Sequence, residues 1–145
     1  MPGIVVGMDG SLHARQAPDW AMREAAMRQA ALTVLAVNPV MASPWTGNPL
    51  AAPNDAQIVA QVREAAQEAV AKSASEIGEA RPASVAVAVL SGFPAKALIE
   101  ASHSADLIVI GSRGTGGFES LLLGSISGQV VQHAACPVVI VPSDR

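Results

Sequence analysis

The sequence predicts an α/β fold, with a doubly wound parallel sheet that carries helices on both faces. Five short apolar runs, rich in β-branched residues, alternate with four longer stretches in which small and apolar residues recur at helical spacing. Four of the five runs are almost continuously apolar, which is typical of strands that are covered on both faces. The length of 145 residues, without a repeat or a linker, predicts a single domain over residues 1–145.

The strand predictions follow the apolar runs, and the third run alternates Val and Ala, which indicates a strand with one face of smaller side chains. In chain order the predicted strands are 3–8, 32–37, 84–90, 106–111 and 137–142. Residues 38–54 contain four prolines, which exclude a helix interior or a central strand. A segment of this length is typical of a lid, a binding loop or a mobile stretch.

The helix predictions rest on small-residue faces and on residues that favour helix starts. Ala17, Ala21 and Ala25 form one face of the first stretch, where Pro18 predicts either a kink or a limited first turn. Pro94 suits the first position of the third helix, and Ser125 suits the N-cap of the last. The four predicted helices are 12–31, 55–79, 94–103 and 125–135.

Composition excludes several classes of function. A net charge of −3 and a pI near 5.5 argue against nonspecific nucleic-acid binding, which needs a basic face. Cys136 is the sole cysteine and cannot form an internal disulfide, so a reducing compartment is expected. The beginning of the sequence does not look like a signal peptide, and no apolar run reaches the ~18 residues of a membrane span. We therefore expect a cytoplasmic protein that binds neither nucleic acid nor membrane.

A glycine-rich segment, "GSRGTGGFESLLLGSIS", follows the fourth predicted strand and leads into the last helix. Loops in this position bind ligands in open α/β sheets, and the start of a helix near Ser125 would present free amides and a positive dipole to an anion. The P-loop and the dinucleotide fingerprint are both absent, because no lysine follows the glycines and "MDGSLHA" follows the first strand. Main-chain amides, serine hydroxyls and a divalent cation would hold phosphates instead.

The spacing of this segment resembles the ATP-binding motif of universal stress proteins. Gly111 is followed by two residues and Gly114, then by nine residues, Gly124 and Ser125. The blocks "GIVVGMDGS", "ADLIVIGSRG" and "HAACPVVIVP" resemble the same family, so the likeness covers essentially the whole chain. It implies the strand order 3-2-1-4-5, in which the first and fourth strands end side by side.

The resemblance also implies a set of binding residues for ATP, with Mg²⁺ or Mn²⁺ bridging the phosphates. Asp9 would lie at the nucleoside end, the main chain of Val37 at the adenine ring, and Gly111 near the ribose. The phosphates would be surrounded by Gly114, Gly124, Ser125 and Ser127. Asp9 would alternatively cap the first helix, and Ser125 is an N-cap with or without phosphate.

Three functions remain open at this point. The first is an ATP-binding regulatory module, the second a slow ATPase or autophosphorylating enzyme, and the third a dimeric interaction protein with a vestigial pocket. The sequence shows no catalytic arrangement and no metal-ligand spacing; His103 and His133 suit helix ends, and Cys136 suits a small buried position. The final strand would be an exposed apolar edge, and the resemblance points the same way, so we expect a homodimer through residues 137–142.

Overall fold

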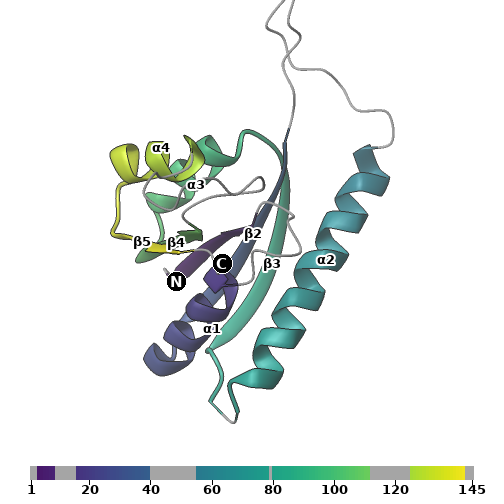
Figure 1. Cartoon of the computed structure of the whole chain (residues 1–145), viewed down its shortest axis with the longest axis vertical. Helices are drawn as coiled ribbons and strands as arrows, with labels where there is room; N and C mark the ends of the chain where they lie inside the picture. Colours follow the sequence, from purple (N-terminus) through teal and green to yellow (C-terminus); the bar gives the residue numbers. More distant parts are fainter. Residues whose placement is uncertain (1–2, 9–15, 40–54, 79, 112–124, 143–145) are drawn as a thin grey trace, which may run out of the picture.

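The computed structural model describes residues 3–8, 16–39, 55–78, 80–111 and 125–142. Five parallel strands form one sheet in the order β3-β2-β1-β4-β5, which confirms the predicted fold class and strand order (Figure 1). All five predicted strands are present, as β1 (Ile4–Met8), β2 (Ala31–Pro39), β3 (Ser84–Gly92), β4 (Leu107–Gly111) and β5 (Val138–Val141).

Two helices cover each face of the sheet. Helices α1 (Gln16–Arg28) and α2 (Asp55–Glu76) pack on one face, and α3 (Pro94–Ser102) and α4 (Ser125–His133) on the other. Neighbouring residues of one strand enter opposite cores, as Val109 does on the α1–α2 face and Ile108 on the α3–α4 face. This two-sided burial explains why the strands read as continuous apolar runs.

Helix α1 confirms the predicted alanine face but ends earlier than residue 31. Gln29 adopts a left-handed conformation with φ of 52°, and the amide of Ala30 donates to the carbonyl of Ala25 over 2.9 Å. This arrangement closes the helix after Arg28, as left-handed C-terminal motifs do. Pro18 lies in the first turn of α1, where an absent amide costs no helical hydrogen bond.

Strand β2 continues past its predicted end at residue 37. Asn38 and Pro39 belong to β2 and pair with β3, so the prediction that they lie outside the sheet is wrong. The pairing of β2 with β1 ends at Ala36, so in the described structure these two residues have a strand neighbour on one side only. A proline is tolerated where a strand has one free side. Residues 40–54 lie outside the described residues.

Side-chain hydrogen bonds connect α1 to α2 on one face of the sheet and α3 to the segment after α4 on the other. The buried Ser73 of α2 donates to the Asp19 carboxylate of α1. On the other face, the hydroxyl of the buried Ser102 in α3 accepts a hydrogen bond from the amide of Ala135 over 2.8 Å and donates to the carbonyl of Ile99. Among the described helices, none has the length and apolar character needed to cross a membrane.

Candidate functional site

At the carboxyl edge of the sheet, the pairing of β1 with each of its two neighbours stops before those neighbours end. The last pair of β1 with β2 is Met8 with Ala36, and the last with β4 is Val6 with Val109. Strand β2 continues past β1 over Val37, Asn38 and Pro39. On the other side, β4 continues unpaired with β1 over Ile110 and Gly111, although β1 itself extends to Met8. We call these five residues of β2 and β4 the stepped edge.

The stepped edge coincides with the topological switch point of the sheet. The chain leaves β1 toward α1 on one face and leaves β4 toward α4 on the opposite face. Open α/β sheets bind ligands outside the carboxyl ends of their strands at such a point. The observed strand order therefore confirms the switch point at which the sequence predicts a site, while the site itself stays a prediction.

Val37 takes part in this edge with its main chain and in the core with its side chain. The residue is 3% exposed, and its side chain packs in the core under α3. Within the described residues, β2 has no strand partner on its β1 side beyond Ala36, so main-chain groups at Val37–Asn38 that point toward β1 make no strand hydrogen bond with β1. Such groups can recognise the hydrogen-bonding edge of a planar base.

Gly111 and α4 bound the other side of the step. Gly111 is the last residue of β4 and pairs with Val141 of β5. Helix α4 starts at Ser125, and its start faces the carboxyl edge because α4 connects the end of β4 to the beginning of the parallel strand β5. The first amides of a helix are unpaired and favour an anion. Ser127 in its first turn is 3% exposed.

The remaining predicted site residues lie outside the described part of the chain. These are Asp9, which directly follows β1, and Gly114 and Gly124 of the glycine-rich segment. The structure thus brings the flanks of the predicted site together, namely Val37, Gly111 and the start of α4. The binding roles of all the predicted site residues, inside and outside the described part of the chain, remain predictions.

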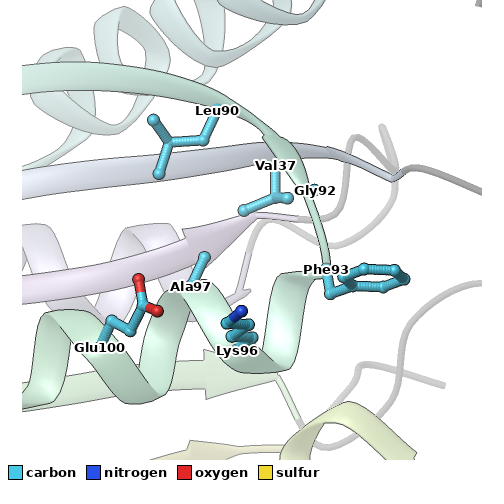
Figure 2. A pocket seen from close by; sticks show the side chains of 7 residues that line it. All are labelled: Val37, Leu90, Gly92, Phe93, Lys96, Ala97 and Glu100. Atoms are coloured by element: carbon cyan, nitrogen blue, oxygen red, sulfur yellow. The ribbon is translucent and has the colours of Figure 1, made fainter. Parts of the chain in front are cut away.

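A pocket of about 240 Å³ opens beside Val37, between the ends of β2 and β3 and the first turns of α3 (Figure 2). Its walls are mainly apolar, and Lys96 and Glu100 of α3 add one charge of each sign. The lining residues are Val37, Leu90, Gly92, Phe93, Lys96, Ala97 and Glu100. The large side chains of Leu90 and Phe93 are 48% and 49% exposed.

The sequence analysis did not identify this pocket. Lys96 is distant from the glycine-rich segment in the sequence, yet α3 carries it to the carboxyl edge and into the pocket with Val37. The available signal was "SGFP" at 91–94, where a glycine and a proline flank one of the two phenylalanines of the chain. Gly92 has φ of 154°, which side-chain-bearing residues rarely adopt, and Pro94 starts α3 directly after Phe93.

Titratable groups elsewhere fit structural positions. His103 is the C-cap of α3, and His133 lies in the last turn of α4, as predicted. Cys136 is half-buried, and this burial raises the pKa of its thiol, so the neutral thiol persists at higher pH. Within the part of the chain that the structure describes, no group of three His, Cys, Asp or Glu side chains comes together as a metal site.

The sequence matches the model of the universal stress protein family over residues 2–142. The chain belongs to this family. A universal stress protein of Mycobacterium tuberculosis is 37% identical over 149 residues, which cover 98% of this chain and 48% of the relative. One of Methanocaldococcus jannaschii is 33% identical and covers 98% of this chain and 82% of the relative. The chain thus spans about half the length of its mycobacterial relative.

Solved universal stress proteins share the fold. UspA from Lactobacillus plantarum has a TM-score of 0.69 at 23% identity and covers 97% of both chains. A universal stress protein in complex with cAMP has a TM-score of 0.67 at 24% identity, covering 99% of this chain and 98% of that one. A family member from Arabidopsis thaliana with AMP bound has a TM-score of 0.61 at 19% identity, covering 99% and 93%.

Proposed function

We propose that this universal stress protein is an ATP-binding regulatory module of the stress response, formed as one domain by residues 1–145. The adenine nucleotide lies across the carboxyl ends of β1 and β4 and acts as a bound signal. The stepped edge carries this proposal, because β2 and β4 both continue past their last pairs with β1. Neighbours in the fold that hold cAMP, dAMP or AMP support an adenine nucleotide as the ligand.

Each part of the nucleotide has a counterpart in the proposed site. The main chain of Val37 contacts the adenine base, Asp9 the nucleoside end, and Gly111 the ribose. A divalent Mg²⁺ or Mn²⁺ offsets the phosphate charge, because the glycine-rich segment contains no lysine. The phosphates are surrounded by Gly114, Gly124, Ser125 and Ser127.

The pocket beside Val37 supports the position of the base. Adenine is a flat ring with two apolar faces, and the pocket offers apolar walls from Leu90 and Ala97 next to the Val37 side chain. Ligand sites typically combine such walls with a few polar groups that set orientation. The main chain of β2 beyond its last pair with β1 would supply polar groups at this position.

Calorimetric titration tests the proposal with three ligands. ATP with Mg²⁺ or Mn²⁺ binds more tightly than AMP, and AMP more tightly than adenosine, because phosphate contacts add to the base contacts. Protein purified without added ligand carries adenine nucleotide, which chromatography of the released ligand detects. Equal affinity for adenosine and for ATP with metal would exclude a phosphate site and favour a vestigial pocket.

The substitution Gly124→Val tests the glycine-rich segment directly. A branched side chain at this position occupies space where phosphate oxygens approach main-chain amides, and it disfavours positive φ. We expect Gly124→Val to abolish ATP binding, while Ser127→Ala, which removes one hydroxyl among several donors, has a milder effect. Normal ATP binding by Gly124→Val would contradict the proposed phosphate site.

We also propose a homodimer through residues 137–142. Strand β5 pairs with β4 on one side and forms an edge of the sheet, and its four residues are all half-buried rather than buried. Val131 of the adjoining α4 is 47% exposed. Pairing of two β5 strands about a two-fold axis covers an apolar edge in a closed assembly. We place this dimer in the cytoplasm.

A further inference from the structure

The described sheet has a second edge strand, β3, which is longer than β5. Strand β3 pairs with β2 along nine positions, from Ser84 opposite Ala31 to Gly92 opposite Pro39, and ends the sheet on that side. A long edge strand presents main-chain hydrogen-bonding groups that can pair with another chain. Because the sheet has two edges, the β3 strand of one copy can pair with the β5 strand of the next. Such head-to-tail pairing continues from copy to copy and forms no closed assembly.

The side chains of β3 offer no protection against such pairing. Its sequence, SVAVAVLSG, contains no charged residue and no proline. Val85 and Leu90 are 40% and 48% exposed, and Ala86 is exposed as well. Edge strands usually carry lysine, proline or a bulge to prevent association.

Helix α2, and not β3 itself, supplies a positive charge at the β3 edge. The Arg63 guanidinium donates from Nη1 to the carbonyl oxygen of Val87 over 3.2 Å, and both the hydrogen bond and the Arg63 side chain are exposed to solvent. Val87 is the fourth of the nine residues of β3, so the charge is held near the middle of the strand. Helix α2 runs alongside β3 over most of the strand (Figure 1).

We propose that Arg63 closes the β3 edge against a second copy of this chain. A strand that docked at the middle of β3 would have to displace the guanidinium or desolvate it beside apolar side chains, and desolvation of an unpaired charge is costly. Assembly then proceeds through β5 and stops at two copies. This inference rests on the proposed β5 dimer, which supplies the closed alternative to a growing ribbon.

Sedimentation velocity over a series of protein concentrations tests the proposal on the purified chain. Arg63→Ala increases the weight-average mass at the highest concentration to about double that of the parent or more, and the increase grows with concentration. Arg63→Lys keeps a positive charge and sediments as the parent does. We expect each variant to fold, because an exposed arginine contributes little to the core, and circular dichroism verifies this.

Two matched variants separate an effect at the edge from a general effect of charge. Arg23→Ala removes the same charge from an exposed position on α1, and it leaves the assembly unchanged. Ala86→Lys in the Arg63→Ala background places a charge on β3 itself and restores the parent mass. The proposal is overturned if Arg63→Ala sediments as the parent, if Arg23→Ala associates equally, or if Ala86→Lys does not restore the parent state.

The same sedimentation data distinguish a failure of the edge proposal from a failure of the proposed β5 dimer. A parent protein that sediments as a monomer contradicts the dimer, whereas the edge proposal depends on the difference between Arg63→Ala and its own parent. A parent that forms dimers together with an Arg63→Ala variant that also stops at dimers contradicts the edge proposal alone.

Discussion

At the scale of single residues, Val37 illustrates how one position serves both the core and the candidate site. Its side chain is buried under α3 and forms a wall of the pocket, while its main chain lies beyond the last pair of β1 with β2. A substitution of the Val37 side chain therefore changes packing first. Tests of nucleotide binding belong at residues whose side chains are proposed to reach the ligand.

Asp9 is such a residue. Loss of a hydrogen bond to a charged group costs about 1.5–3 kcal/mol, so Asp9→Ala is expected to weaken ATP binding by roughly ten- to a hundredfold. Titration calorimetry measures the change, and circular dichroism verifies that the fold persists. Unchanged affinity would leave Asp9 as a cap of the first helix.

Three glycines allow a second prediction at this scale, on stability. A Cβ at Gly3 would collide with the main-chain carbonyl oxygen of Ala31, and one at Gly7 would lie 2.9 Å from Cδ1 of Leu98, whereas nothing lies within 4 Å at Gly128 in α4. We expect Gly3→Ala to lose about 1–3 kcal/mol and Gly7→Ala to lose less, because a side chain yields more readily than a main chain.

Gly128→Ala is the matched control, for which we expect a gain in stability in place of a loss. Alanine in a helix interior is favoured over glycine by about 1 kcal/mol, so this variant gains stability. Urea denaturation of the three variants gives the comparison. A loss of stability in Gly128→Ala, or no loss in Gly3→Ala, would contradict the close approach of β1 and β2 at Gly3.

At the scale of elements, the buried Ser102 connects α3 to the segment between α4 and β5. Ser102→Ala removes the hydroxyl that accepts from the amide of Ala135 and donates to the carbonyl of Ile99, and a hydrogen bond typically contributes about 0.5–1.5 kcal/mol. Ser104→Ala is the matched control, because the exposed Ser104 hydroxyl makes only a long bond of 3.4 Å to Ala101. Thermal unfolding should show a lower Tm for Ser102→Ala alone.

The sequence was sufficient to predict which elements form and less so where they end. Apolar runs located all five strands, because burial on both faces leaves a continuous signal in the inner strands and the two edge strands are apolar as well. The ends depend on local geometry that composition does not record. Gln29 stops α1 by adopting a left-handed conformation, and Pro39 remains in β2 because the pairing of β1 with β2 ends at Ala36.

The sequence predicted those parts of the candidate site that are contiguous in the sequence or that follow from the strand order. The glycine-rich segment is contiguous in the sequence, and the strand order places Gly111 and Val37 on either side of β1. The pocket is different, because it combines β2 with the β3–α3 connection across more than fifty residues of sequence. No local pattern relates Lys96 to Val37; only the pairing of β2 with β3 and the packing of α3 bring them together.

At the scale of the whole molecule, the proposed dimer is tested by charges on the two sheet edges. Val139→Lys places a charge on β5 and is expected to convert the dimer to a monomer in sedimentation equilibrium. Val85→Lys places the same charge on β3 and leaves the dimer intact, because β3 is not the proposed interface. Val139 is half-buried, so circular dichroism must first establish that its variant folds. A dimeric, folded Val139→Lys would contradict pairing through β5.

The central position of β1 has a consequence for the time course of biosynthesis. Val5 pairs with Thr33 of β2, but it also pairs with Ile108 of β4, about a hundred residues later in the chain. At roughly 5–20 residues per second, the ribosome needs about 5–20 s to deliver this second partner. During that interval β1, β2 and β3 can assemble with α1 and α2, while the side of β1 that will receive β4 remains an unpaired edge of the nascent sheet. The strand at the centre of the finished sheet is therefore the one that waits longest, during translation, for the partner on one of its two sides.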